Sequence, residues 1–265
     1  MAQLRQMLLA GLLAGASAAA LVSCAALPAA TTSATAAKPE PSLGGVKHSI
    51  SQERLKQLDA AMKAYVADEK IAGAVVMIQQ DGKDVFSEAY GFRDKEAGDP
   101  MKEDTIFRIA SQSKALTSVA IMMLMEEGKL VLDDPLGKFL PEWQRTTVAA
   151  PRIGGGYDVV PARRAITIRD LLTHTAGISY GAGPGERAWR EAGIYGWYFA
   201  DKREPVSEVV KRMAKLPMTE QPGEQWVYGY NTDILGVVVE KISGQTLDQF
   251  VRTRLTEPLG MVDTS

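Results

Sequence analysis

Two serines in this sequence lie in patterns that suit acyl-transfer chemistry. The first, Ser111, begins the stretch Ser-Gln-Ser-Lys and is followed three residues later by Lys114. Residues i and i+3 share one face of a helix, so the amine of Lys114 can lie beside the hydroxyl of Ser111. A lysine desolvated on an apolar helix can shift toward its neutral form and accept a proton. The pattern alone is common, because a helix-capping serine followed by a surface lysine also produces it.

The second candidate, Ser179, lies in Gly-Ile-Ser-Tyr-Gly, which fits the G-x-S-x-G pattern of a nucleophile elbow. An elbow serine follows a strand and depends on a histidine base. Ser179 instead follows a predicted short helix. The chain has only two histidines, His48 and His174, and neither lies downstream of Ser179. We therefore favour Ser111 as the nucleophile and interpret Ser179 as a loop serine between glycines.

The elements that must position Ser111 can be read from the pattern of apolar residues. A first helix is predicted to begin near Ser51, a suitable N-cap. Asp81-Gly82 between two β-rich runs predicts an antiparallel hairpin. Residues 115–125 are apolar almost all round, which predicts a buried helix that is too short to span a membrane. Mostly helical patterns follow.

Further along the chain, Thr167 and Asp170 have the spacing of a capping box, and the short helix that they open is predicted to end at Gly177. The glycine-rich stretch 151–164 is predicted to be an exposed excursion. It is no phosphate-binding loop, since no Gly-Lys-Ser/Thr follows its glycines. Residues 180–205 are predicted to form a long loop.

Composition limits the classes of function. The 265 residues are 46% hydrophobic and 23% charged, which is typical of a globular domain. The net charge of −2 and the absence of a long basic run argue against a nucleic-acid partner. Cys24 is the only cysteine, so neither an internal disulfide nor a cysteine-based metal site can form. No metal or organic cofactor is expected.

The N-terminal residues 1–23 are interpreted as an export signal. Arg5 supplies positive charge, a short apolar run follows, and Leu-Val-Ser-Cys ends at Cys24, which resembles a bacterial lipobox. We expect a lipid on Cys24 to be the only link to a membrane and expect the protein to be periplasmic. An ordinary cleaved signal, with Ala-x-Ala at 34–36, or an uncleaved anchor would be the alternatives.

The remainder is divided into a tether and a domain. Residues 24–46 are rich in Ala, Thr, Ser, Pro and Gly, which predicts a flexible tether. Residues 47–265 are predicted to form one catalytic domain.

Four stretches resemble one known family. They are MKEDTIFRIASQSKALTSVAIMMLMEEGKLVLDDPLGKFLPEW, ITIRDLLTHTAGI, PGEQWVYGY and EPLGMVDTS. In this order they are similar to the serine beta-lactamase-related superfamily, which includes class C beta-lactamases, D-alanyl-D-alanine carboxypeptidases and family VIII carboxylesterases. The resemblance runs from about residue 50 to the last residue. It implies an α+β fold of the beta-lactamase/transpeptidase type, with an antiparallel sheet flanked by helices and a mainly helical lobe.

The resemblance also implies roles for particular residues. Ser111 would accept the acyl group, and Lys114 would share its proton network. The family's Tyr-x-Asn element supplies a base or proton relay, and the distance to the following Asp-Ile-Leu-Gly matches Tyr228 to its tyrosine. Tyr230 then replaces the asparagine, and Asn231 lies one residue late. A rival alignment would use Tyr230 as the relay.

The replacement of that asparagine favours a substrate class. In the penicillin-recognising members it contacts the amide side chain of the substrate, whereas the family VIII esterases commonly vary there. We therefore expect a carboxylesterase for small esters. A beta-lactamase or D-alanyl-D-alanine carboxypeptidase, acting on beta-lactam-like or peptide substrates, and a non-catalytic homologue remain the alternatives.

The resemblance implies a third motif, Lys-Thr-Gly or a variant, on a strand beside the nucleophile. No such motif occurs in the 265 residues. We expect this chain to be C-terminally truncated, without the C-terminal sheet strands. As a result, we expect the 265-residue form to be weakly active, inactive or poorly folded, and its full-length relative to be an active hydrolase.

Overall fold

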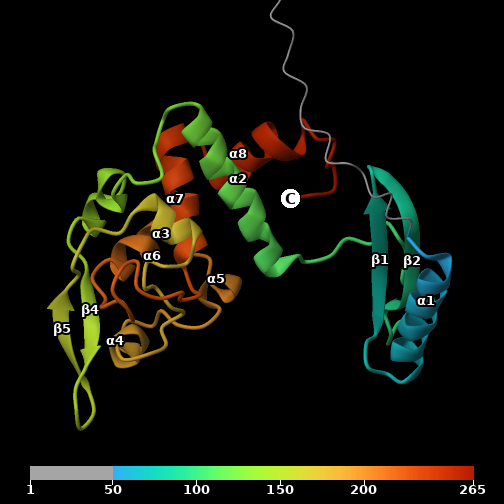
Figure 1. Cartoon of the computed structure of the whole chain (residues 1–265), viewed down its shortest axis with the longest axis horizontal. Coiled ribbons are helices and arrows are strands. Elements are labelled where there is room, and N and C mark those ends of the chain that lie inside the picture. Colours follow the sequence, from blue (N-terminus) through green and yellow to red (C-terminus); the bar gives the residue numbers. More distant parts are fainter. Residues whose placement is uncertain (1–49) are drawn as a thin grey trace, which may run out of the picture. The chain divides into compact units, whose positions relative to one another are not determined.

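The computed structural model describes residues 50–265 (Figure 1). The predicted export signal, the lipidation site Cys24 and the predicted tether all lie outside the described residues, as does His48. The described residues divide into two compact units, and the boundary falls within the first helix, between Ala61 and Met62.

The first helix, α1, spans Gln52–Ala67. Ser51 is its predicted N-cap, and its Oγ accepts a hydrogen bond from the Arg54 backbone N–H at 3.4 Å. The predicted apolar face is only partly buried, because Leu55 is buried whereas Tyr65 is 46% exposed.

The predicted hairpin is confirmed. Strands β1 (Gly73–Gln80) and β2 (Lys83–Asp94) pair antiparallel, and the short β3 (Asp99–Pro100) extends the sheet in the order β1-β2-β3. Asp81 and Gly82 at the turn both have positive φ, 52° and 70°. Two consecutive positive φ values are what a tight hairpin of the type I′ class requires.

The hydrophobic core is built on two helices, α2 (Ser113–Glu126) and α7 (Asn231–Ser243), which pack against each other (Figure 1). Three shorter helices also contribute to it: α3 (Ile168–Leu172), α6 (Val206–Met213) and α8 (Leu247–Val251). A π-helical turn, Arg252–Thr256, continues α8. Helix α7 ends at Gly244 in the left-handed conformation, the usual glycine stop.

Helix α2 is less buried than its composition predicts. It buries Ile121 and Leu124 completely, yet Val119 and Met122 on another face are 43% and 37% exposed. The predicted buried helix is therefore present with one face in the core and another face uncovered, because apolar composition does not determine how many faces find a partner.

Two segments predicted to be irregular contain regular structure. The stretch after residue 146 forms a second hairpin, β4 (Thr147–Pro151) and β5 (Tyr157–Pro161), whose tip contains Gly154, Gly155 and Gly156. The predicted long loop 180–205 holds α4 (Glu186–Glu191) and α5 (Tyr198–Asp201). These elements are only four to six residues long, so their patterns are too short to separate from a loop.

Helix α3 is opened by the predicted capping box. The Asp170 backbone N–H donates to Thr167 Oγ1 at 3.2 Å, and the Thr167 N–H donates to Asp170 Oδ2 at 2.9 Å. Arg164 also donates to both oxygens of the buried Asp170 carboxylate, at 2.6 and 2.8 Å. The helix ends at Leu172, earlier than the predicted Gly177, because His174 takes a left-handed conformation with φ 57°.

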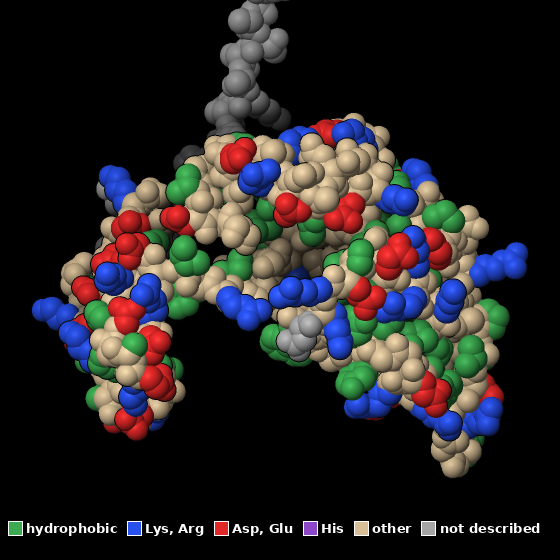
Figure 2. Space-filling model, turned by 180° about the vertical axis from the view of Figure 1, so that it is seen from behind, with side chains coloured by type: hydrophobic (Ala, Val, Ile, Leu, Met, Phe, Trp, Pro, Cys, Tyr) green, Lys and Arg blue, Asp and Glu red, His purple; other side chains and the backbone are tan. Residues whose placement is uncertain are grey.

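Within 50–265 no helix is both long and apolar enough to cross a bilayer. The same residues contain no group of three or more His, Cys, Asp or Glu side chains arranged to hold a metal ion. On the face shown in Figure 2, acidic and basic side chains are interspersed, in keeping with the small net charge.

Candidate active site

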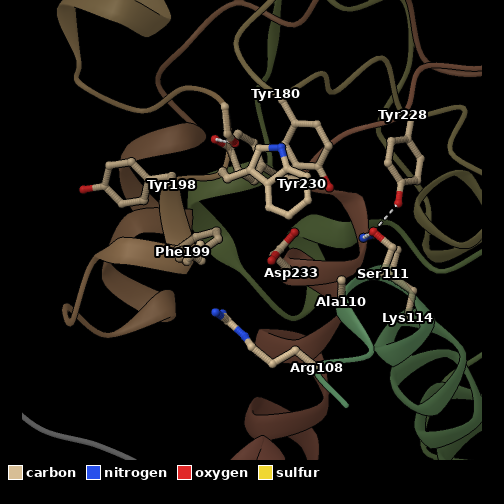
Figure 3. Close-up of a pocket in the computed structure, with 13 residues that line it drawn as sticks. Arg108, Ala110, Ser111, Lys114, Tyr180, Tyr198, Phe199, Tyr228, Tyr230 and Asp233 are labelled. Carbon is tan, nitrogen blue, oxygen red and sulfur yellow. Dashed lines mark hydrogen bonds between the residues drawn. The ribbon is translucent and has the colours of Figure 1, made fainter. Parts of the chain in front are cut away.

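Ser111 lies in a 3-10 turn, η1 (Ala110–Gln112), immediately before α2. Lys114 Nζ donates a hydrogen bond to Ser111 Oγ at 3.0 Å. Tyr228, 117 residues further along the chain, donates its hydroxyl to the same oxygen at 2.8 Å (Figure 3). The structure thus brings together the three residues that sequence analysis selected. Ala110 beside them has a φ of 45°, a strained value for alanine of the kind that often accompanies functional sites.

The electrostatics of Lys114 differ from the sequence-based expectation. Burial acts to lower the pKa of Lys114, but hydrogen bonding to Tyr228 and attraction to Tyr180 and Tyr228 raise it above its ordinary value. Hydrogen bonding with Lys114, first of all, and with Ser111 lowers the pKa of Tyr228, against the opposing effect of burial. The expectation of a lysine shifted toward neutral is therefore wrong. Lys114 keeps its charge, and Tyr228 becomes the group that releases its proton more easily.

Tyr228 is held by other aromatic rings. Its ring centroid lies 4.9 Å from that of His174, 5.7 Å from Trp226, with which it stacks, and 5.6 Å from Tyr180, which meets it edge-on. The Val227 backbone N–H also donates to the His174 carbonyl at 2.7 Å. The turn that follows α3 therefore fixes both the backbone and the ring of the tyrosine segment.

Asn231 holds the same segment in place through hydrogen bonds. Its buried side-chain amide donates to the carbonyls of Ile178 and Val227, both at 3.2 Å, and lies 3.0 Å from His174 Nδ1. An amide nitrogen donates and does not accept, so its two hydrogens are shared among these three acceptors, Nδ1 is one of them, and the ring proton is on Nε2. Burial and the charge of Lys114 lower the pKa of His174, which favours this neutral form. Asn231 thus has a structural task and, as expected, does not face Ser111.

Tyr230 occupies a different place from Tyr228. Its hydroxyl donates to the Gly196 carbonyl at 2.8 Å, and its side chain is buried. Burial, first of all, raises its pKa well above the ordinary value. Of the two tyrosines in Tyr-Gly-Tyr, only Tyr228 directs its hydroxyl to Ser111, which is the geometry that our preferred alignment requires.

Ser179 has no access to this chemistry. Its hydroxyl donates to the Ala182 carbonyl at 2.8 Å and accepts from the Ala182 N–H and the Thr219 hydroxyl, both at 3.0 Å. The backbone of Ile178 and Ser179 instead packs directly against Gly229, which lies between the two tyrosines. A Cβ on Gly229 would lie 2.3 Å from the Ile178 carbonyl oxygen and 2.4 Å from the Ser179 carbonyl carbon, so no larger residue fits there. The segment with the G-x-S-x-G pattern therefore packs against Tyr-Gly-Tyr and has a structural role.

A cavity of about 760 Å³ opens beside Ser111 (Figure 3). Its aromatic wall is formed by Tyr180, Trp197, Tyr198, Phe199 and Tyr230. Charged groups are also present, since Arg108, Lys114 and Asp233 line it. An apolar cavity with a few converging polar groups is the usual form of a small-molecule site.

Sequence reasoning missed Asp233, His174 and the task of Asn231. Asp233 lies in the first turn of α7, among buried residues, and burial raises its pKa to about 6, against a smaller opposing effect of Lys114. A signal was present, because an aspartate at the start of an otherwise apolar helix is costly to bury without a role. His174 gave no such signal, since its conformation depends on long-range contacts.

Comparison with known proteins adds independent findings. A family model described as Beta-lactamase matches residues 58–265. Protein Rv1367c of Mycobacterium tuberculosis is 40% identical over 201 residues, which cover 73% of this chain and 47% of that protein. Esterase EstB of Burkholderia gladioli is 36% identical over 213 residues, covering 78% of this chain and 50% of the esterase.

Among solved structures, EstCE1, described as a hydrolase with promiscuous acyltransferase activity, superimposes with a TM-score of 0.67 and 30% identity. The match covers 79% of this chain and 52% of EstCE1. The chain therefore spans about half the length of each of these three proteins.

Proposed function

Since this chain belongs to the beta-lactamase family and has its α+β fold, we propose that it is a serine hydrolase of small carboxylic esters that works through an acyl-enzyme on Ser111. The observation that carries the proposal is the convergence of Lys114 and Tyr228 on one serine oxygen, at 3.0 and 2.8 Å. The similarity to an esterase, EstB, supports the choice of substrate class.

In the first half-reaction, the phenolate of Tyr228 takes the hydroxyl proton of Ser111, and the Ser111 oxygen attacks the ester carbonyl carbon. The charged Lys114 stabilises the phenolate and the alkoxide. When the tetrahedral intermediate collapses, the bond to the alcohol oxygen breaks. Tyr228 returns the proton to that oxygen, so the leaving group departs as an alcohol.

In the second half-reaction, Tyr228 takes a proton from water, and the hydroxide attacks the acyl carbon on Ser111. The bond to the serine oxygen breaks, the acid leaves, and the proton returns to Ser111. An alcohol in place of water would turn the same step into acyl transfer, the side activity named for EstCE1. No metal or cofactor enters either step.

The substrate class can be tested with two chromogenic compounds. We expect the purified chain to hydrolyse p-nitrophenyl acetate and to leave the beta-lactam nitrocefin intact, and we expect Ser111→Ala to remove the esterase activity. Turnover of nitrocefin without turnover of the ester would support a beta-lactamase instead. Unchanged ester hydrolysis in Ser111→Ala would show that another residue is the nucleophile.

We also propose that the protein is exported and held at a bacterial membrane by a lipid on Cys24. The support for this proposal is the order of the N-terminal residues: a basic start, an apolar run and small residues before the cysteine.

A further inference from the structure

Asp233 presents a carboxylate to the cavity beside Ser111 without a partner to neutralise it (Figure 3). Its flanking residues Thr232 and Ile234 are buried, and its own side chain is only partly exposed. Among the described residues, its carboxylate has no ion pair and no hydrogen bond beyond the one from its own backbone N–H. Burying an ionised group in this way is unfavourable unless something binds it.

The cations near Asp233 are directed elsewhere. Lys114 donates to Ser111 and Tyr228, and it only partly offsets the effect of burial on the pKa of Asp233. Arg108, the other cation that lines the cavity, is exposed and makes no ion pair with Asp233. The carboxylate is therefore free to meet a ligand. Because its pKa is about 6, it is ionised at slightly alkaline pH.

The surroundings of Asp233 suit a positive charge. The cavity carries five further aromatic side chains besides Tyr228: Tyr180, Trp197, Tyr198, Phe199 and Tyr230. The faces of such rings attract ammonium groups, most strongly when the cation is desolvated. A carboxylate within an aromatic wall offers both attractions that a quaternary or protonated amine requires, whereas a neutral acyl chain would use only the rings.

We propose that Asp233, together with this aromatic wall, binds an ammonium group carried by the ester substrate, an inference that rests on the proposed esterase function. Asp233 then determines specificity, and the substrates are small esters with a cationic group on the acyl or the alcohol side. It takes no part in proton transfer at Ser111.

Kinetics with matched esters test this assignment. On the acyl side, p-nitrophenyl 4-(trimethylammonio)butanoate is compared with its carbon isostere, p-nitrophenyl 5,5-dimethylhexanoate. On the alcohol side, acetylthiocholine is compared with 3,3-dimethylbutyl thioacetate. At pH 8 we expect kcat/KM to favour the cation in at least one pair by about tenfold or more, and Asp233→Asn to abolish that preference while the neutral esters are still hydrolysed.

A matched control removes the same charge elsewhere. Asp263 is exposed and does not line the cavity, so Asp263→Asn should leave the preference unchanged. No preference for the cation in either pair would overturn the proposal. An equal loss of activity on cationic and neutral esters in Asp233→Asn would overturn it as well, since the carboxylate would then serve Lys114 and not the substrate.

A binding measurement separates this inference from the esterase activity. Calorimetric titration with phenyltrimethylammonium at pH 8 needs no turnover. We expect binding to the unchanged chain and to Asp263→Asn, and an affinity at least about tenfold lower for Asp233→Asn. Equal affinities for all three proteins would contradict the site. If binding follows the prediction but no ester is hydrolysed, the cation site stands and the proposed esterase function fails.

Discussion

The oxygen of Ser111 accepts hydrogen bonds from both Lys114 and Tyr228, so its two lone pairs are occupied and its own proton points elsewhere. Before Ser111 can attack, one of the two donors must become an acceptor. The pKa of Lys114 is raised and that of Tyr228 is lowered, so the tyrosine is the group that changes its role. These two directions support Tyr228 as the base of the proposed mechanism.

Replacing the two neighbouring tyrosines should therefore have very different effects. Tyr228→Phe removes the proposed base, and we expect acylation of Ser111 to slow by about 10²–10⁴-fold. Tyr230→Phe removes only a hydrogen bond to the Gly196 carbonyl and should change the rate less than about tenfold. Pre-steady-state release of p-nitrophenol measures both rates. A larger loss for Tyr230→Phe would mean that the rival alignment is correct.

Asp233 should make stability depend on pH. Its pKa is about 6 in the folded chain, above the ordinary value of 3.8 that applies after unfolding. As pH rises, the carboxyl therefore loses its proton at a lower pH in the unfolded state than in the folded state. The contribution of Asp233 to the free energy of unfolding falls between about pH 4 and 6 and stays low above pH 6. About two pKa units correspond to a ceiling of about 3 kcal/mol.

Asp233→Asn removes this penalty. We expect the change in the free energy of unfolding caused by the substitution to be more favourable at pH 8 than at pH 4 by up to about 3 kcal/mol. Urea unfolding at both pH values measures it. Asp263→Asn serves as the control, since Asp263 is exposed. The same effect of Asp233→Asn at both pH values would show that the carboxyl is not desolvated. If Asp233→Asn is more stable than the unchanged chain at pH 8 but no longer prefers cationic esters, the Asp233 carboxylate serves function at a cost in stability.

At the scale of elements, the site depends on how α7 and the turn after α3 are joined. Asn231, the first residue of α7, contacts Ile178, Val227 and His174. Asn231→Ala leaves two carbonyls and a ring nitrogen without this donor, and we expect a loss of about 2–3 kcal/mol in the free energy of unfolding.

The same substitution should loosen the ring of Tyr228 and lower kcat. Lys241→Ala, at an exposed position of the same helix, should change stability by less than about 0.5 kcal/mol. Urea unfolding and ester hydrolysis measure the two effects. An Asn231→Ala chain with full stability and full activity would show that this contact does not hold the site together.

Elements fixed by local chemistry were predictable from the sequence. Asp81-Gly82 specifies its turn by conformational preference, and Thr167 with Asp170 specifies a helix start by two reciprocal hydrogen bonds. The end of α3 was not predictable, because His174 takes its left-handed conformation where tertiary contacts with Tyr228 and Asn231 hold it. The short hairpin β4–β5 was not predicted, because its glycine-rich tip is typical of an irregular loop.

In the candidate site, too, local sequence determines some contacts and long-range packing determines others. Ser111 and Lys114 are one helical turn apart, so the sequence alone brings them together. Tyr228 joins them across 117 residues, and only the family resemblance pointed to it. The local pattern around Asp233 shows an acidic residue at the start of an apolar helix, but the cavity that it faces is formed by distant segments, so the sequence could not show what the carboxylate is for.

For the whole molecule, membership of the beta-lactamase family gives the α+β fold, and similarity to EstB and EstCE1 supports the hydrolase chemistry that we propose. The chain matches about half of each relative's length, so the activity of the entire protein remains our proposal.

The proposed membrane anchor has a direct test at this scale. When the chain is expressed in a bacterium fed with radiolabelled palmitate, we expect it to become labelled and to fractionate with membranes. Cys24→Ser should remove the label, because Cys24 is the only cysteine. Soluble periplasmic protein without label would instead support an ordinary cleaved signal.

The central claim, that Ser111 is an activated nucleophile, is tested most directly by mapping the adduct of a fluorophosphonate probe by mass spectrometry on folded protein. We predict one modified peptide, with the phosphonate on Ser111, slower labelling in Tyr228→Phe, and none in Ser111→Ala. A phosphonate on Ser179, or folded protein that the probe does not modify at all, would contradict the account.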